Sequence, residues 1–335
     1  MQWERLADVN LNRLNESLKF IEDIVRFIII DRGLLDRLRH LRQEFLVVKK
    51  TLPIAGIIRF RDSQKDLGRK SRFDAAAKKN MVDLVIANFT RAKESARILE
   101  ETMKCVYPKV SNKVKKIRFQ LYDIEKLFIN YFAKIFDPSL CVVLDEKYVK
   151  RHRLKQLIGV LKNRATMIQL RIKSLSDRIF YDYARVVVDN LKSCDIKFII
   201  NNRLDIALAC GADGVHLGQE DMPIDVARRA LGDGSIIGAS AHNLAEARKA
   251  EKDGADYIGV GSIFATKTKP DAKTCGLQRL RAICKAATIP VVGIGGITAD
   301  NYKSVRRAGA SGIAVSSFLF EGNLKNNLHS LTGNK

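Results

Sequence analysis

The stretch KFIINNRLDIALACGADGVHLG, residues 197–218, contains a short apolar run, a helical segment, a glycine and a second apolar run. Alternation of short apolar runs with helical segments is typical of β/α units around a parallel sheet. Other elements cover both faces of such a sheet, so its strands are apolar throughout. The same alternation continues on both sides of this stretch, and we predict an α/β fold for this part of the chain.

Eight apolar runs of this kind follow one another in the C-terminal part of the chain. They cover residues 140–145, 167–173, 197–202, 214–218, 236–240, 257–263, 289–295 and 312–317. Eight strands, each followed by a helix, make up a (β/α)8 or TIM barrel. A doubly wound sheet is the alternative, but it usually has five or six strands and a GxGxxG motif after the first. The number and order of the runs favour the barrel.

Residues 1–136 follow a different pattern. NRLNESLKFIEDIVRFII (12–29) and NFTRAKESARILEETMK (88–104) place apolar residues three and four apart, which is typical of amphipathic helices. We therefore predict a separate, mainly α-helical domain at residues 1–136, followed by the barrel at residues 137–335.

The helical part contains an internal repeat with an offset of 78 residues. Five positions are identical in the two copies: Asn10, Arg13, Glu16, Ser17 and Glu22 match Asn88, Arg91, Glu94, Ser95 and Glu100. Each copy places an arginine and a glutamate on one helix face, as an intrahelical ion pair or as a functional pair. The basic segment between the copies, residues 59–72, is either a phosphate and metal loop or an exposed connection.

The charge of the chain admits two classes of partner. Lys and Arg number 59 and Asp and Glu 37, a net charge of +22, which suits a nucleic-acid binder or an enzyme for anionic small molecules. The excess is +12 in residues 1–136 and +10 in the remainder, without a basic tail. The N-terminus lacks a signal-peptide pattern, and the strongest apolar stretch, Phe27–Ile30, is too short to span a bilayer. The six cysteines form no CxxC pair, so we expect a reduced, cytoplasmic protein.

Polar residues follow the apolar runs, where a barrel of this kind carries its active site. These candidates are Gln169, Arg171, Lys173, Asn201, Asn202, Gln219, Glu220, Asp221, Ser240, His242, Thr266, Thr268, Lys269, Gly295, Gly296, Ser316 and Ser317. The turn GIGGIT (293–298), with a helix expected from Ala299, and the small-residue turn at 316–317 together predict a phosphate site. Asp221 beside Asn202 offers oxygen ligands for Mg2+. His216 is expected in the core or behind a residue of the site rather than as a base, and His242 is a weak candidate for a base.

The chemistry that these residues suit needs few proton transfers. No Ser/His/Asp set and no catalytic Cys/His pair stands out in the sequence. Two anion pockets, a metal and cationic side chains favour a reaction driven by a good leaving group such as pyrophosphate.

The ordered motifs resemble those of thiamine-phosphate synthases. They are KFIINNRLDIALACGADGVHLGQEDMP, GASAHN, GADYIGVGSIFATKTKPD, VVGIGGIT and GIAVSS, within about residues 138–325. The resemblance implies a barrel enzyme that joins hydroxymethylpyrimidine diphosphate to hydroxyethylthiazole phosphate with Mg2+. Thiamine monophosphate and pyrophosphate are then the products of a dissociative mechanism.

The resemblance also implies a role for each matching residue. Gln169, Arg171, Lys173 and Asn201 would bind the pyrimidine diphosphate, and Ser240 and Lys269 would lie at its diphosphate. Asp221 with Asn202 would hold the metal, and Lys173, Ser240 and Lys269 would be catalytic. The thiazole-phosphate pocket would consist of Thr266, Thr268, Gly295, Gly296, Ser316 and Ser317. Two positions depart from the family pattern, because Asn202 replaces a common Asp and Ile172 a common Glu.

The N-terminal part resembles the ThiD2 domain that is fused to some bacterial thiamine-phosphate synthases. NLNRLNESLKFIEDIVRF, RDSQKDLG and ANFTRAKESARILEE carry this likeness, within about residues 5–105. It implies that the domain phosphorylates the pyrimidine monophosphate, or binds it and hands it over. No P-loop is present.

Two other functions stay open on the sequence: an inactive barrel that binds nucleic acid or regulates, and another phosphate-binding barrel such as an epimerase. We expect small-molecule substrates, without nucleic-acid or membrane partners. A homo-oligomer is compatible with the sequence.

Overall fold

The computed structural model describes residues 3–61, 81–192, 194–266 and 274–332. The chain divides into two compact units, Met1–Phe132 and Ala133–Lys335. Each unit has its own hydrophobic core.

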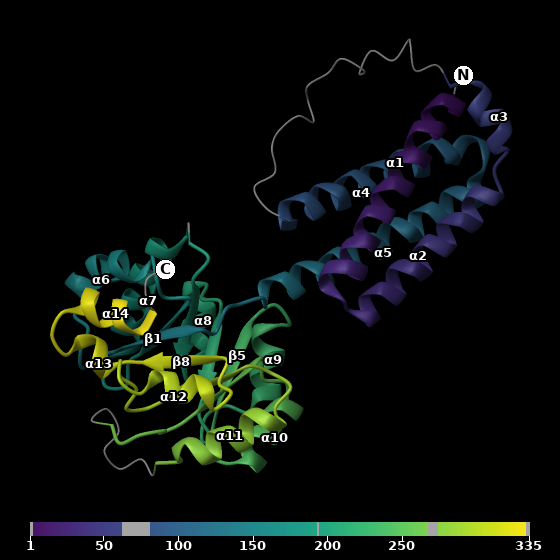
Figure 1. Ribbon diagram of the computed structural model, residues 1–335. Helices are drawn as coiled ribbons and strands as arrows, with labels where there is room; N and C mark the ends of the chain where they lie inside the picture. Colours follow the sequence, from purple (N-terminus) through teal and green to yellow (C-terminus); the bar gives the residue numbers. More distant parts are fainter. Residues whose placement is uncertain (1–2, 62–80, 193, 267–273, 333–335) are drawn as a thin grey trace. The chain divides into compact units, whose positions relative to one another are not determined.

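The first unit is helical throughout its described residues, as the sequence predicted. Its helices are α1 (Trp3–Ile24), α2 (Arg32–Lys50), α3 (Ile54–Arg59), α4 (Met81–Val106) and α5 (Pro108–Ala133), shown in Figure 1. Helix α1 continues into a π-helical turn, Val25–Ile29, which ends at Ile30 in the left-handed conformation. Asp31 then caps α2, because its carboxylate accepts a 2.8 Å hydrogen bond from the backbone N–H of Leu34.

The repeated positions occupy matching environments on α1 and α4, which lie side by side (Figure 1). Three residues of each copy are at most 8% exposed: Asn10, Ser17, Glu22, Asn88, Ser95 and Glu100. Both asparagines donate from Nδ2 to the carbonyl oxygen four residues earlier, at 2.8 Å. The arginine and the other glutamate of each copy are exposed, and no ion pair joins them within the described residues. The buried positions of the repeat therefore serve the packing of the helices, and a functional pair of the exposed arginine and glutamate stays a prediction.

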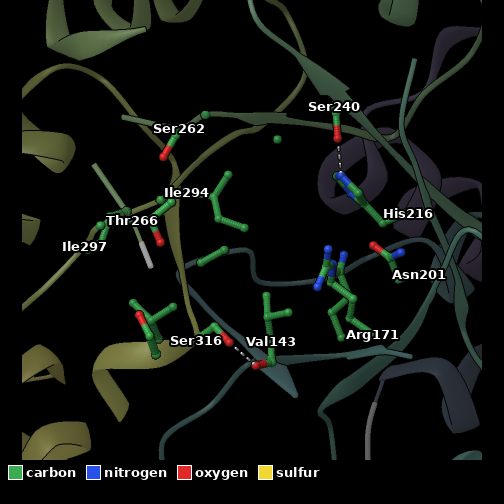
Figure 2. Close-up of a pocket in the computed structure, with 18 of the residues that line it drawn as sticks. Val143, Arg171, Asn201, His216, Ser240, Ser262, Thr266, Ile294, Ile297 and Ser316 are labelled. Carbon is green, nitrogen blue, oxygen red and sulfur yellow. Dashed lines mark hydrogen bonds between the residues drawn. The ribbon is translucent and has the colours of Figure 1, made fainter. Parts of the chain in front are cut away.

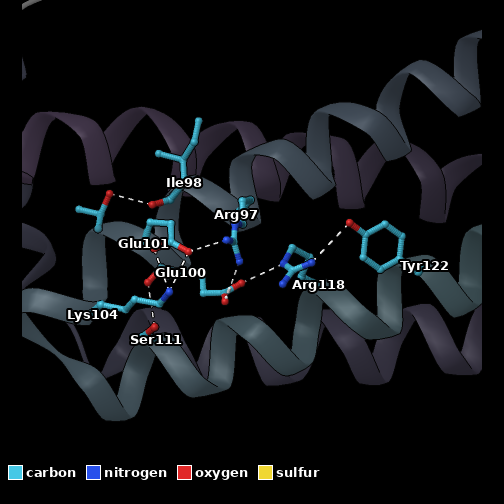
Figure 3. Close-up of polar contacts among 9 residues, drawn as sticks. Arg97, Ile98, Glu100, Glu101, Lys104, Ser111, Arg118 and Tyr122 are labelled. Carbon is cyan, nitrogen blue, oxygen red and sulfur yellow. Dashed lines mark hydrogen bonds and ion pairs between the residues drawn. The ribbon is translucent and has the colours of Figure 1, made fainter.

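The buried glutamates of the repeat join neighbouring helices. Glu22 on α1 pairs with Arg42 and, at 3.6 Å, with Arg39, both on α2. Glu100 on α4 pairs at 2.9 Å with Arg118 on α5 and at 3.1 Å with Arg97 on its own helix (Figure 3). A buried carboxylate needs such partners, because an unpaired charge in the interior is costly.

The second unit is the predicted (β/α)8 barrel. Its strands are β1 (Leu140–Asp145), β2 (Met167–Arg171), β3 (Lys197–Asn201), β4 (Gly214–Leu217), β5 (Ile236–Ala241), β6 (Tyr257–Val260), β7 (Val291–Ile294) and β8 (Gly312–Val315). All neighbours are parallel and in chain order, and β8 pairs with β1, which closes the barrel. The predicted α/β fold class is therefore confirmed.

Helices follow the strands around the outside of the barrel (Figure 1). They are α6 (Leu154–Leu161), α7 (Asp177–Leu191), α8 (Leu204–Cys210), α9 (Ile224–Leu231), α10 (Leu244–Lys252), α11 (Gly276–Ala286), α12 (Tyr302–Arg307), α13 (Ser317–Phe320) and α14 (Leu324–Thr332). Among the described residues, no helix has the length and hydropathy that crossing a membrane requires.

Alternate residues of the strands face the interior of the barrel and the surrounding helices. On β1, Val142 and Leu144 pack toward the helices, whereas Cys141 and Val143 belong to the interior cluster. Burial raises the pKa of the Cys141 thiol to about 12. Phe136, which precedes β1, packs against Tyr257 of this cluster with 5.6 Å between ring centroids.

Candidate active site

A cavity opens at the carboxyl ends of the strands, where the sequence analysis placed the functional residues (Figure 2). The structure brings ten of those candidates to its wall: Gln169, Arg171, Asn201, Ser240, His242, Thr266, Gly295, Gly296, Ser316 and Ser317. Thr268 and Lys269 lie outside the described residues, as do residues 62–72 of the basic segment in the helical unit. Lys173, Asn202 and Asp221 are described but do not line the cavity.

Arg171 is fixed in the cavity wall by a carboxylate that the sequence analysis missed. Asp145, fully buried at the end of β1, forms an ion pair with Arg171 at the end of β2. The two residues are direct partners in the parallel register of these strands. An ion pair with a buried carboxylate holds a guanidinium in place. Asp145 is the last residue of the first apolar run, where a barrel of this kind carries functional residues, and this position could have identified it.

A second unexpected carboxylate supports the turn after β2. Glu146 accepts hydrogen bonds from the backbone N–H groups of Lys173, at 3.1 Å, and Ser174, at 3.1 and 3.2 Å. Partial burial acts to raise the pKa of Glu146, but these hydrogen bonds outweigh it and the pKa is lowered. Ile172 is 6% exposed and packs in the core. Ile172 replaces a glutamate that is common in the resembled family, and Glu146 places a carboxylate beside the same turn.

The two small-residue turns predicted for phosphate line the same cavity. Gly295 and Gly296 both have positive φ, 98° and 64°, and a Cβ at Gly295 would lie 2.1 Å from the Ser262 hydroxyl oxygen. Only glycine fits this turn without strain. Ser316 donates from its hydroxyl to the carbonyl oxygen of Val143 at 2.9 Å, and Ser317 begins α13 (Figure 2).

The helix expected from Ala299 begins three residues later, at Tyr302, so that prediction was wrong. The side chain of Asn301 explains the delay. Its Oδ1 accepts from the backbone N–H of Thr298 and its Nδ2 donates to the carbonyl of Gly296, both at 2.9 Å. These bonds stabilise a turn before the helix.

The candidate metal ligands are oxygen donors in two separate loops. Asn202 has a positive φ of 65° and accepts from the Asn201 amide at 2.5 Å. Asp221 accepts from the backbone N–H of Gly218 at 2.5 Å, within its own loop. Within the described parts of the chain, no group of three His, Cys, Asp or Glu side chains could hold a metal. One carboxylate and one amide oxygen still suit Mg2+, which takes its other ligands from water and substrate phosphates.

His216, which the sequence placed in the core or behind a residue of the site, reaches the cavity wall. Its Nε2 lies 3.0 Å from the Ser240 hydroxyl and its Nδ1 lies 3.0 Å from the Tyr257 hydroxyl (Figure 2). Val215 and Leu217 on either side pack outward, so strand alternation was a signal that His216 faces inward. His242 also lines the cavity and donates from Nδ1 to the Gly261 carbonyl at 2.6 Å.

Comparison with known proteins identifies the family. Residues 140–319, more than half of the chain, match the family model described as thiamine monophosphate synthase. The chain belongs to the thiamine monophosphate synthase family. Residues 5–127 of this synthase match the ThiD2 family. Both resemblances are therefore confirmed, and the ThiD2 match extends past residue 105 into α5.

Relatives of the synthase cover either the whole chain or the barrel. The thiamine-phosphate synthase of Synechococcus sp. (strain WH7803) is 35% identical over 326 residues, which cover 93% of this chain and 90% of that protein. That of Coprothermobacter proteolyticus is 49% identical over 180 residues, 53% of this chain and 85% of that protein. A solved structure, thiamine phosphate pyrophosphorylase from Pyrococcus furiosus, has a TM-score of 0.53 at 40% identity and covers 58% of this chain and 94% of that one.

The synthase is a transferase of thiamine biosynthesis that forms thiamine monophosphate. This confirms the activity that the sequence motifs implied. The same matches favour the synthase over the two alternatives, an epimerase and an inactive barrel that binds nucleic acid or regulates.

Proposed function

We propose that the barrel joins hydroxymethylpyrimidine diphosphate to hydroxyethylthiazole phosphate in the cavity at the carboxyl ends of its strands. The observation that carries this proposal is that one cavity has a cationic wall at Arg171 and a pair of small-residue turns at 295–296 and 316–317. The diphosphate of one substrate and the phosphate of the other would bind at opposite sides of the cavity. The reacting carbon of the pyrimidine substrate and the nitrogen of the thiazole would then lie close together between them.

The wall at Arg171 suits the diphosphate. Arg171, held by Asp145, offers a guanidinium, and Gln169, Asn201 and Ser240 offer neutral hydrogen-bonding groups. Lys173 and Lys269 are the further cations that we assign to this substrate. Thr266, Thr268, Gly295, Gly296, Ser316 and Ser317 form the thiazole-phosphate pocket in this proposal.

The proposed reaction is dissociative. The C–O bond between the pyrimidine methylene carbon and the diphosphate breaks, and its electron pair leaves with pyrophosphate. The lone pair of the thiazole nitrogen then forms a C–N bond with the resulting pyrimidine methyl cation. Neither step removes a proton from a reacting atom, which agrees with a described cavity wall that carries hydrogen-bond donors and one guanidinium, Arg171. Arg171 and Ser240 would stabilise the charge that develops on the leaving diphosphate.

We assign Asn202 and Asp221 as the residues that hold Mg2+. When bound, Mg2+ offsets negative charge on the diphosphate. An Asn202→Asp variant adds an anionic ligand, so it should reach half-maximal rate at a lower Mg2+ concentration than the unaltered enzyme. A higher Mg2+ requirement would contradict this assignment.

The activity test uses the purified full-length chain with both substrates and Mg2+. Thiamine monophosphate and pyrophosphate should appear in equal amounts, and Arg171→Ala should lower the rate about 100-fold or more. Arg229→Ala is the matched control, because Arg229 pairs with Asp225 on the exposed face of α9. Absence of product from the unaltered protein would refute the proposed reaction.

For the helical unit we propose that it handles the pyrimidine monophosphate, supported by its match to the ThiD2 family. The full-length chain is given the pyrimidine monophosphate and thiazole phosphate, with and without ATP. Product that depends on ATP indicates phosphorylation by the chain itself. No product with ATP, together with turnover of the diphosphate, would leave binding and transfer as the function. We also propose a cytoplasmic location, since both substrates are charged phosphates that do not cross membranes freely.

A further inference from the structure

A row of hydrogen-bonded side chains leads from the interior of the barrel to Ser240. Tyr257, at the start of β6, is 2% exposed and its hydroxyl oxygen lies 3.0 Å from Nδ1 of His216. Nε2 of His216 lies 3.0 Å from the hydroxyl oxygen of Ser240 on β5 (Figure 2). The row therefore joins a buried phenol to a hydroxyl in the cavity wall.

The barrel leaves space for these two rings. A Cβ at Gly238 would lie 2.1 Å from Cζ of Tyr257, and a Cβ at Gly259 would lie 2.8 Å from Cε1 of His216. Phe136 packs against Tyr257 in an edge arrangement, with 5.6 Å between the centroids. The two rings therefore pack directly against the backbone at Gly238 and Gly259, and this close packing holds them in place.

The partners of Tyr257 set the direction of the hydrogen bonds. Burial raises the pKa of Tyr257 well above its usual value, so the phenol keeps its proton. A buried hydroxyl hydrogen needs an acceptor, and Nδ1 of His216, at 3.0 Å, is the acceptor that the structure places at the Tyr257 hydroxyl. Nδ1 then accepts, so a neutral ring carries its proton on Nε2 and donates to Ser240.

This direction determines what Ser240 can do. If Nε2 of His216 donates to the Ser240 oxygen, the hydrogen of the Ser240 hydroxyl is free to point into the cavity. In the opposite direction, Ser240 would donate to His216 and its hydrogen would be unavailable to a substrate. A hydroxyl has only one hydrogen to donate.

We propose that Tyr257 is a positioning residue for the reaction, acting through His216 to present the Ser240 hydroxyl as a donor to a diphosphate oxygen. This rests on the proposed role of Ser240 at the diphosphate. A donor oriented before the substrate arrives needs no reorganisation when charge develops on the leaving group.

The direct test is the tautomer of His216 in the full-length protein labelled with 15N-histidine. Each ring nitrogen gives a signal that shows whether it carries a hydrogen. The other four histidines, His40, His152, His242 and His329, are exposed, so replacing each by Gln assigns the remaining pair to His216.

Hydrogen on Nε2 and none on Nδ1 supports the proposal, and hydrogen on Nδ1 overturns it. In Tyr257→Phe the ring and its packing remain but the hydroxyl is lost, so the His216 signals should shift toward a mixture of tautomers. An unchanged tautomer in Tyr257→Phe would also overturn the proposal. The spectra are recorded without substrate, so they test the hydrogen-bond direction at His216 even if the protein does not catalyse the proposed reaction.

The kinetic test asks whether Tyr257 acts through Ser240. Tyr257→Phe should lower kcat about 10-fold with little change in KM for the thiazole phosphate. In a Ser240→Ala background the same change should have no further effect on kcat. Tyr183→Phe is the matched control, since its hydroxyl accepts a 3.0 Å bond from the Arg151 N–H outside the barrel interior. Equal losses in both backgrounds would show that Tyr257 acts independently of Ser240.

Discussion

Two carboxylates next to each other in the sequence perform different tasks at the edge of the cavity. Asp145 is buried and pairs with the Arg171 side chain, whereas Glu146 is partly exposed and binds the backbone of the turn at 173–174. Asp145 is the last residue of β1 and Glu146 begins the turn that follows it, so the two neighbours serve different partners. Together they fix the last side chain of β2, Arg171, and the turn that follows this strand.

Replacing Asp145 by Asn should lower the rate of the enzyme although Asp145 does not line the cavity itself. The change removes the charge that holds the Arg171 guanidinium, so we expect kcat/KM for the pyrimidine diphosphate to fall about 100-fold. Steady-state kinetics measure this, with Asp182→Asn as the control because its pair with Arg151 is exposed. An unchanged kcat/KM would mean that Arg171 is positioned without Asp145.

The contribution of Glu146 to stability should depend on pH. Its pKa is lower in the folded chain, so its contribution is complete above the pKa of the unfolded chain and is lost as pH falls through the folded value. Glu146→Gln should therefore lower Tm at pH 7 and approach the unaltered Tm in acid. Thermal melts of both proteins between neutral and acidic pH measure the difference, and a constant difference across this range would contradict the prediction.

At the scale of elements, the helical unit is joined by paired charges between helices. Glu22 connects α1 to α2, and Glu100 connects α4 to α5. These contacts recur with the sequence repeat, so each copy of the repeat has its own link to the following helix.

Replacing Glu100 by Gln should destabilise the helical unit by about 3 kcal/mol, because Arg118 is left as a buried charge without its partner. Denaturant unfolding of the full chain, followed by helical circular dichroism, measures the loss. The neighbouring Glu101→Gln is the matched control, since Glu101 is exposed and pairs only at the surface with Arg97 and Lys104. Equal effects of the two changes would show that burial does not decide the strength of the pair.

The order of elements was predictable from the sequence, but many contacts between them were not. Short apolar runs and helical periodicity are recognised from residues that are close in the sequence. The eight strands and the helical unit could therefore be predicted. The Asp145–Arg171 pair depends on the register of two strands, 26 residues apart in the chain. Strand alternation predicts that His216 faces inward, but its contact with Ser240 depends on how β4 lies beside β5. The helix start at Ala299 was predicted from the glycines of GIGGIT alone. The observed start of α12 depends on the hydrogen bonds of the Asn301 side chain, which those glycines do not indicate.

At the scale of the whole molecule, the closure of the barrel has a consequence for how the chain is made. β1 must pair with β8, and Leu140 meets Ile313 in that pairing. At about 5–20 residues per second, a ribosome needs roughly 10–30 s between the two strands. During that time β1 has an unpaired edge, which is a site for wrong pairing with other chains. The helical unit precedes both strands, so it is complete while the barrel still waits for its last partner.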